Sequence, residues 1–336
     1  MSSSIKIKGI GRYIPEKVVD NKFFIDHFHK EEWGNKEVGG LLDKLGRKER
    51  HFCTKEENSL TRGIEASKDV LERIDDITAT DIDMIVFVSD TPEYNMPTNA
   101  ILIGKEIGAS NANIVFDMNC NCVGMIVALD NVCSFMKTHD SIKNALVVGS
   151  VHFSSIVRFD DTVTYPNFGD GSSAVILSKS EEENVGIIAS KYKSDTAYSN
   201  YVRFPSCGHS NSLLGKQHKY YRRLEWNPFN SSFFADWFSE LITQLFEDYG
   251  ISDKDIAYYA FSQLSDSDNK RTLNMLNAVI DERYLYNGDK FGYTGCNSPI
   301  IALSDVWGSI QDYKGKYVII ISVGAGASMS ALLYKI

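Results

Sequence analysis

One cysteine stands where protein architecture favours a reactive thiol. Cys122 lies between a strand-like run, residues 113–116, and a helix-like run, residues 125–136. A thiol at such a junction is close to a helix N-terminus, whose dipole and free N–H groups stabilise a thiolate. We therefore predict that Cys122 is a nucleophile with a lowered pKa, and that it is alkylated faster than the other five cysteines.

Structural roles remain open for Cys122 and for the cysteine and histidine residues that could act with it. A cysteine taken alone is more often a buried structural thiol than a nucleophile. Cys120 forms a Cys-x-Cys pair with Cys122, but no second pair has zinc-ligand spacing, so we expect Cys120 in the core and no metal site. No histidine follows His218. His209 could supply an imidazole from a loop, although a solvent-facing histidine is the simpler interpretation.

Length and composition indicate a globular protein whose partners are small molecules or other proteins. The 336 residues, 43% of them hydrophobic, suffice for two domains or one large two-lobed unit. A net charge of -9 and a pI of about 5.3 argue against binding to nucleic acid or to anionic membranes. We find neither a spanning apolar run nor a signal-peptide core, and expect a cytoplasmic protein with reduced cysteines.

The elements that would position Cys122 follow a pattern that recurs in the second half of the chain. The first half reads as helix 60–74, strand 81–89, helix 99–107, the cysteine segment, and strands 145–149 and 172–177. The second half reads as helix 233–249, strand 255–262, helices 271–279 and 300–310, and strand 317–323. Alternating strands and helices predict a layered α/β fold with its site between the halves. Residues 192–226, aromatic and without a period, are interpreted as a lid or substrate loop.

The order and spacing of seven short segments resemble the ketoacyl-ACP synthase III branch of the thiolase superfamily. The matching segments are residues 9–15, 46–51, 117–124, 145–150, 168–171, 291–294 and 324–328. The resemblance covers essentially the whole chain. It implies a five-layered αβαβα fold of two pseudo-symmetric halves, residues 1–178 and 179–336, usually assembled as a homodimer. It also implies that Cys122 carries an acyl group.

The resemblance extends to the groups around the cysteine, with two departures. The family pairs its cysteine with a histidine and an asparagine, and the matching positions here hold Ser262 and Tyr293. Both hydroxyls can donate hydrogen bonds, but a serine cannot act as a base near neutral pH without an activator. The implied oxyanion hole consists of the N–H groups of Cys122 and Ala325. These backbone donors do not depend on the side chains that changed.

Other positions implied by the resemblance concern the acyl chain and its donor. Met96 matches the residue that reaches into the partner subunit's acyl tunnel, and Lys270 and Arg271 are candidates for docking an acidic acyl carrier protein. The family commonly stacks the adenine of coenzyme A between a tryptophan and an arginine, and the nearest matching positions here hold Gly40 and Lys44 instead. Acyl-ACP is therefore the expected donor ahead of acyl-CoA, and no permanently bound cofactor is expected.

Three functions of different classes remain on this basis. The first is a 3-oxoacyl-ACP synthase III-like enzyme that forms acyl-Cys122 and passes the acyl group to malonyl-ACP or another acceptor. The second is a catalytically silent subunit in a heterodimer with an active homologue, and the third is a module that holds an acyl thioester without turnover. The retained Cys122 and the run 324–326 favour the first function, whereas the changes at Ser262 and Tyr293 favour the second.

Overall fold

Two five-stranded sheets form the framework of the protein, as a computed structural model describes it for residues 4–215 and 219–336. The first sheet has the order β1 (Ser4–Tyr13), β7 (Gly171–Ser180), β6 (Asn144–Val151), β4 (Met84–Val88) and β5 (Ile114–Met118). The second has the order β12 (Tyr284–Leu285), β11 (Ile256–Phe261), β13 (Tyr317–Gly324), β14 (Ser328–Lys335) and β8 (Gly186–Ser194). The chain passes from the first sheet to the second between β7 and β8.

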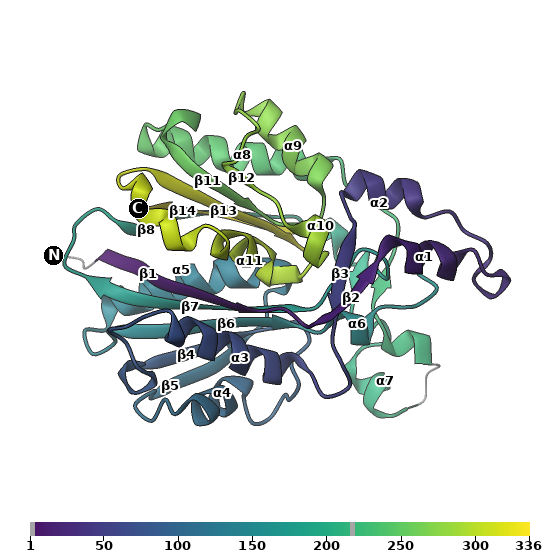
Figure 1. The fold of residues 1–336 in the computed structure, drawn as a ribbon, viewed down its shortest axis with the longest axis horizontal. Helices are drawn as coiled ribbons and strands as arrows, with labels where there is room; N and C mark the ends of the chain where they lie inside the picture. Colours follow the sequence, from purple (N-terminus) through teal and green to yellow (C-terminus); the bar gives the residue numbers. More distant parts are fainter. Residues whose placement is uncertain (1–3, 216–218) are drawn as a thin grey trace.

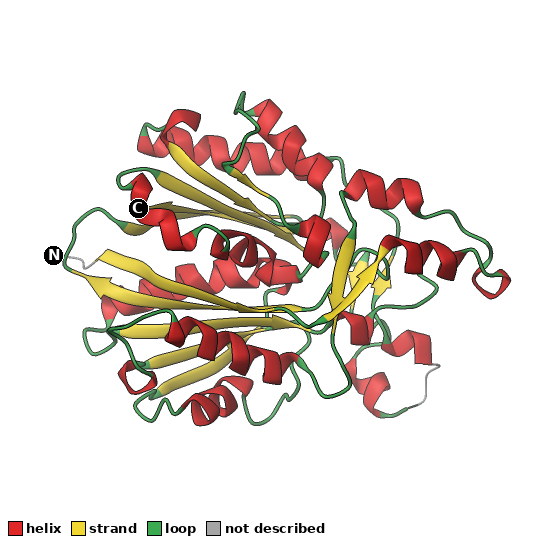
Figure 2. Cartoon of the chain, in the orientation of Figure 1, coloured by secondary structure: helices red, strands yellow, loops and turns green. Residues whose placement is uncertain are grey.

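Helices lie between the sheets and on both outer faces (Figure 1 and Figure 2). The central layer holds α5 (Gly124–Thr138) and α11 (Ser298–Ser304), which contact strands of both sheets. The outer layers hold α3 (Ser59–Glu72) and α4 (Asn99–Ile107) on one side, and α8 (Phe233–Tyr249) and α9 (Asp266–Met275) on the other. This arrangement is the five-layered αβαβα fold that the sequence predicts.

The two sheets repeat one strand arrangement. In the first, β4 is parallel to both β5 and β6; in the second, β11 is parallel to both β12 and β13. Every residue of β4 and of β11 is buried, as expected for continuous apolar runs in sheets covered on both faces. The carboxyl end of β5 leads to Cys122, and the carboxyl end of β11 leads to Ser262.

Several element boundaries differ from the sequence predictions. The helix expected over 271–279 is α9, which begins at Asp266 because the Ser265 side chain accepts a hydrogen bond from Asp268 N. The helix expected over 300–310 ends at Ser304 and is followed by a 3-10 segment, Trp307–Tyr313. Strands β8 and β14 were not predicted.

The chain also contains several shorter elements. These are β2 (Lys17–Asp20), α1 (Asn21–Phe28), α2 (Gly39–Leu45), β3 (Glu49–Phe52), α6 (Phe153–Ile156), β9 (Val202–Arg203), α7 (His209–Leu213), β10 (Glu225–Trp226) and α10 (Gly288–Phe291).

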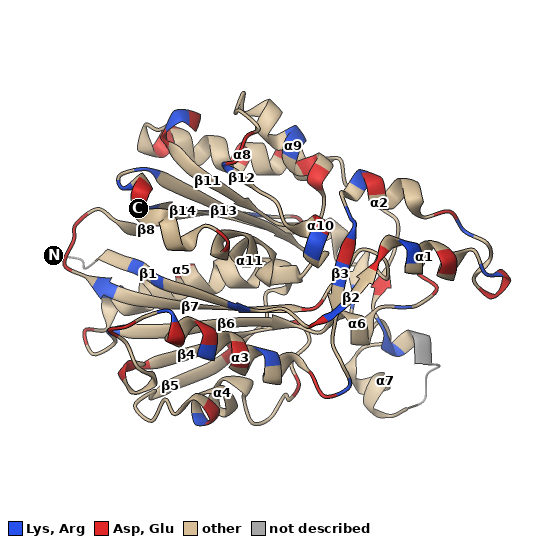
Figure 3. Cartoon of the chain, in the orientation of Figure 1, with Lys and Arg blue, Asp and Glu red and all other residues tan. Residues whose placement is uncertain are grey.

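Charged residues lie mainly on the outer helices, the loops and the strand ends, and the two signs are interspersed there (Figure 3). The interior layers are built instead from apolar side chains. Among the described residues, no helix combines the length and the apolar character needed to cross a membrane.

A buried arginine joins the segment before β3 to the second half of the chain. The Arg47 side chain is 2% exposed, and burial lowers its pKa. Its guanidinium donates to Tyr286 Oη (2.8 Å), Gly288 O (3.1 Å), Leu264 O (3.0 Å) and Gln263 O. A planar group with five donors suits such a set of acceptors, and a lysine could not reproduce it.

We expect Arg47→Ala to lower the free energy of unfolding by about 3 kcal/mol, because it leaves several buried carbonyls without a donor. Urea denaturation followed by circular dichroism would measure the change. Arg73→Ala is the matched control, since its pair with Asp69 is exposed and should be worth less than about 1 kcal/mol. Equal effects of the two substitutions would show that the Arg47 bonds do not stabilise the fold.

Candidate active site

Cys122 lies in the first helical turn after β5, as the sequence predicts. The 3-10 segment Asn121–Val123 contains it and leads directly into α5. Asn121 has a left-handed backbone with φ of 51°, a conformation that asparagine tolerates better than most residues. The carbonyl of Cys122 accepts a hydrogen bond from Ser322 Oγ of β13 at 2.8 Å. The nucleophile candidate is therefore held by elements from both halves of the chain.

The carboxyl end of β13 approaches the backbone of Cys122 closely. A Cβ atom on Gly324 would lie 3.3 Å from both Cys122 N and Val123 N, so glycine leaves room for this contact. Ala325 follows Gly324 and lines the same cavity as Cys122, and its carbonyl accepts from Asn121 Nδ2 at 3.5 Å. The N–H groups of Cys122 and Ala325 thus belong to neighbouring backbone segments, as an oxyanion hole requires.

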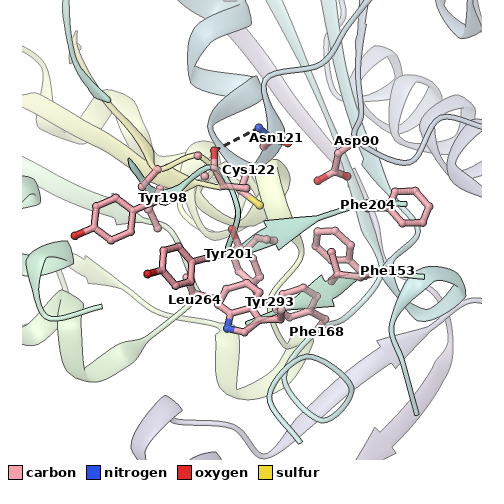
Figure 4. Close-up of a pocket in the computed structure, with 18 of the residues that line it drawn as sticks. Asp90, Asn121, Cys122, Phe153, Phe168, Tyr198, Tyr201, Phe204, Leu264 and Tyr293 are labelled. Carbon is pink, nitrogen blue, oxygen red and sulfur yellow. Dashed lines mark hydrogen bonds between the residues drawn. The ribbon is translucent and has the colours of Figure 1, made fainter. Parts of the chain in front are cut away.

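An apolar cavity opens over Cys122 and encloses about 860 Å³ of empty space, part of it continuous with solvent (Figure 4). Nine of its 22 lining residues are aromatic. Residues from the segment predicted as a lid or substrate loop form much of that lining: Tyr198, Tyr201, Val202, Phe204, Leu224 and Trp226. Phe153, Phe168 and Phe229 add further rings. Such a cavity suits an apolar chain with a reactive group at the cysteine end.

The structure brings Tyr293 and Ser262 to the cysteine. Both are 1% exposed, and neither hydroxyl has a hydrogen-bond partner of standard geometry among the described residues. The Tyr293 hydroxyl nevertheless interacts with the Cys122 thiol, which lowers the pKa of Cys122, and with the Ser262 hydroxyl. The three groups therefore form one polar cluster at the cysteine.

The prediction that Cys122 has a lowered pKa is wrong. Burial and then the charge of Asp90 raise the pKa of Cys122 to about 12, and the interaction with Tyr293 offsets only part of this. Burial also raises the pKa of Cys53, Cys120, Cys133 and Cys296. Cys122 is therefore a protonated thiol at neutral pH. Its reactivity depends on proton removal during attack, and a preformed thiolate does not supply it.

Asp90 is a residue of this cavity that the sequence analysis missed. It lies two residues beyond β4 and lines the cavity together with Cys122. Its Oδ1 is buried and has no hydrogen-bond partner among the described residues, and burial raises the pKa of its carboxyl to about 6. The one available signal was a polar residue just past a buried parallel strand, where ligands commonly bind in α/β sheets.

Models of the 3-oxoacyl-ACP synthase III family match the chain in two blocks. The model of 3-oxoacyl-[acyl-carrier-protein] synthase III matches residues 116–196, and the model of its C-terminal part matches residues 246–336. A beta-ketoacyl-[acyl-carrier-protein] synthase III from Clostridium botulinum (strain 657 / Type Ba4) is 31% identical, with 98% of each chain covered. The chain belongs to the 3-oxoacyl-ACP synthase III family.

Relatives at lower identity have the same architecture. The synthase III of Clostridium novyi is 28% identical over 99% of both chains. The crystal structure of 3-oxoacyl-[acyl-carrier-protein] synthase III from Aquifex aeolicus superposes with a TM-score of 0.84 at 24% identity, covering 99% of this chain and 100% of that one. The priming β-ketosynthase of the R1128 polyketide pathway gives a TM-score of 0.83 at 20% identity, with 99% and 97% covered. These structures confirm the thiolase-like fold.

Residues predicted from the synthase III resemblance for the acyl tunnel and for carrier docking lie away from the cavity. Met96 is 86% exposed and does not line the cavity of its own chain. Lys270 and Arg271 lie on α9, half exposed, and are paired with Asp266 and Asp236. All three assignments stay predictions, because each concerns a partner.

Two further residues of the sequence analysis have different surroundings from those expected. Cys120 is partly exposed, so its expected place in the core is wrong. His209 begins α7, is exposed, and does not line the cavity. The simpler interpretation of this histidine, as a solvent-facing residue, is the one that the structure supports.

A second cluster of polar side chains was not foreseen from the sequence. The potential ligand atoms of Cys53, His152 and Asp170 lie within 4.8 Å of one another. The Asp170 carboxylate already accepts hydrogen bonds from Cys53 N and from Ser154 N and Oγ. Burial raises the pKa of Cys53 and lowers the pKa of His152. The cluster thus serves to tie the turn before β7 to its neighbours.

We expect Tyr293→Phe to slow alkylation of Cys122 by iodoacetamide several-fold at pH 8. Loss of the hydroxyl removes the interaction that lowers the pKa of Cys122, so less thiolate is present at that pH. Peptide mass spectrometry at timed intervals would give the rate. Tyr249→Phe, an exposed tyrosine at the end of α8, is the control. An unchanged rate in Tyr293→Phe would show that its hydroxyl does not act on the thiol.

Proposed function

We propose that the chain is a 3-oxoacyl-ACP synthase III-like acyltransferase that takes an acyl group from a thioester onto Cys122 and passes it to malonyl-ACP or another acceptor. The observation that carries this proposal is the placement of Cys122 in a helical first turn, beside the Ala325 backbone, at the end of an apolar cavity. Relatives that align over the whole chain and are named beta-ketoacyl-ACP synthase III support it.

In the first half-reaction, the Cys122 sulfur attacks the thioester carbonyl carbon. A carbon–sulfur bond forms, and the carbonyl oxygen takes the negative charge, which the N–H groups of Cys122 and Ala325 stabilise. The bond to the donor sulfur then breaks, and the donor leaves as a thiol. The aromatic cavity holds the acyl chain and excludes water, which protects acyl-Cys122 from hydrolysis.

We propose that Ser262 and Tyr293 replace the histidine and asparagine of the family. In decarboxylative condensation, those groups donate hydrogen bonds to the enolate that forms as malonyl-ACP loses carbon dioxide. Two buried hydroxyls that lack a hydrogen-bond partner of standard geometry among the described residues provide donors for that role. Neither hydroxyl is a base at neutral pH, and burial holds the pKa of Tyr293 well above its usual value.

An acyl carrier protein is the proposed donor, docking through Lys270 and Arg271 on α9. Acyl-CoA is the alternative donor, and no permanently bound cofactor or metal is proposed. Trp33, the tryptophan nearest to the coenzyme A positions of the family, stacks on His27 with ring centroids 4.7 Å apart and packs on the core. It is therefore occupied within the chain rather than presented to an adenine.

We propose a homodimer, in which Met96 of one subunit reaches the acyl cavity of the other. Strand β5 is at the edge of the first sheet, and all five of its residues are partly exposed, which leaves it open to a partner strand. A heterodimer with an active homologue is the alternative assembly. We also propose that residues 1–178 and 179–336 form two structural halves, and that the protein works in the cytoplasm.

The catalytically silent subunit is not favoured. A subunit without chemistry has no need for a cysteine at a helix start, a close glycine contact that fixes its backbone, and an empty apolar cavity above it.

Incubation with a series of acyl-ACP and acyl-CoA thioesters should produce an acyl adduct on Cys122, visible by intact-protein and peptide mass spectrometry. We expect at least a tenfold preference for acyl-ACP, because the donor is recognised through protein contacts. Cys122→Ala should abolish the adduct, and Cys120→Ala, which changes the neighbouring thiol, should leave it. A folded wild-type protein that takes no acyl group from any donor would contradict the proposal.

Trp226→Ala should shift the preferred donor toward longer acyl chains by about tenfold in relative kcat/KM, because the indole bounds the cavity. Trp226 packs against Phe168 and Phe229, each with ring centroids 5.9 Å away. Acylation rates with a chain-length series would measure the shift. Tyr221→Ala, exposed in the same segment and outside the cavity, is the control. An unchanged order of chain lengths would show that Trp226 does not limit the acyl chain.

A further inference from the structure

A single carboxylate shares the cavity with the nucleophile candidate. Among the described residues that line the cavity, Asp90 is the only one with a carboxyl, imidazole or amino group. It follows β4, whereas Cys122 follows β5, and the two strands are parallel neighbours with Val88 opposite Met118. Their carboxyl ends therefore open at one edge of the sheet. Figure 4 shows both side chains at the same end of the cavity, with aromatic rings beyond them.

Hydrogen bonds fix the residues on either side of Asp90, while one oxygen of its carboxylate has no partner among the described residues. Ser89 Oγ donates to Ser150 O at 2.6 Å, and Thr91 Oγ1 accepts from His152 N at 2.8 Å. No described residue satisfies Asp90 Oδ1, which is buried. Burying a carboxylate without a partner is costly, so a fold that holds one rigidly at a reactive centre points to a role in chemistry.

The charge of Asp90 acts on the groups that face it. It raises the pKa of Cys122, Tyr293 and Cys296, and no other charged side chain contributes to the raised pKa of Cys122. Burial raises the pKa of Asp90 to about 6, so the carboxylate is ionised at pH 8 beside a protonated thiol. Acid–base groups work best when their pKa lies near the working pH.

We propose that Asp90 is the acid–base residue of acyl transfer, an inference that rests on the proposed function. Its carboxylate takes the proton of the Cys122 thiol as the sulfur forms its bond to the donor carbonyl carbon. When the carbon–sulfur bond of the donor breaks, the protonated Asp90 returns that proton to the departing sulfur. A donor thioester and a cysteine thiol thus become acyl-Cys122 and a donor thiol, with no proton gained or lost.

The neighbouring hydroxyls cannot take this role. Ser262 has no described base to activate it, and Tyr293 holds its proton more firmly than a free tyrosine does. Both are donors toward oxygen, whereas Asp90 is the acceptor for a proton. In this proposal Asp90 acts on the sulfur, and Ser262 and Tyr293 donate to the substrate oxygen.

Asp90→Asn tests the proposal through two rates that should change in opposite directions. Formation of acyl-Cys122 should slow by about a hundredfold, the usual scale of general-base catalysis. Alkylation of Cys122 by iodoacetamide at pH 8 should become faster, because the substitution removes a negative charge that raises the pKa of the thiol. A substitution that only damaged the structure would not make alkylation of Cys122 faster while it made formation of acyl-Cys122 slower.

Glu93→Gln is the matched control, since it removes a carboxylate from the exposed part of the same loop, outside the cavity. It should change neither rate. Asp90→Glu should restore part of the acylation rate that Asp90→Asn loses. If the wild type is acylated and Asp90→Asn is acylated equally fast, the inference is overturned while the proposed function stands. If the wild type accepts no acyl group, the proposed function fails, and the acid–base role is overturned with it.

Discussion

A close contact between two backbones fixes the nucleophile, and the rest of the site depends on it. Gly324 lies so near Cys122 that a side chain there would meet the amide nitrogen, and Ser322 of the same strand donates to the Cys122 carbonyl. Cys122 belongs to the first half of the chain, whereas β13 belongs to the second. The cysteine backbone and the Ala325 backbone are therefore placed together only when both sheets have packed against α5. The reactive geometry is a product of the whole five-layered fold, and no single loop could supply it.

Burial affects the pKa of the Cys122 thiol more strongly than the helix dipole does, which explains why the thiol keeps its proton. A helix N-terminus is worth about 0.3–1 kcal/mol to a negative charge in its first turn. Burial, with the charge of Asp90 added, raises the pKa of Cys122 from 9.0 to about 12, which corresponds to about 4 kcal/mol. The position of Cys122 at a helix start is thus outweighed by the dry surroundings that hold an acyl chain. A site of this kind needs a group that removes the proton at the moment of attack.

The sequence predicted the elements whose signal is local and missed features that depend on tertiary contacts. Continuous apolar runs identified β4 and β11, and the resemblance to the family placed Cys122, Ser262 and Tyr293 together. The raised pKa of Cys122 could not be foreseen, because it results from burial in the folded protein and from the charge of Asp90, which is distant in sequence. Asp90 has no motif of its own, and its importance follows from burial after β4. Strands β8 and β14 were not predicted, although they pair with each other at the edge of the second sheet.

Three buried polar atoms near Cys122 lack hydrogen-bond partners within the part of the chain that the structure describes, and the proposed reaction would provide a partner for each of them. Among the described residues, Ser262 Oγ, Tyr293 Oη and Asp90 Oδ1 are buried and lack a hydrogen-bond partner of standard geometry. Each such group costs about 1–3 kcal/mol when nothing fills it. A thioester brings a carbonyl oxygen that accepts hydrogen bonds, and the attacking thiol brings a proton that must be taken up. In the proposed reaction, the substrate and Cys122 together complement all three groups.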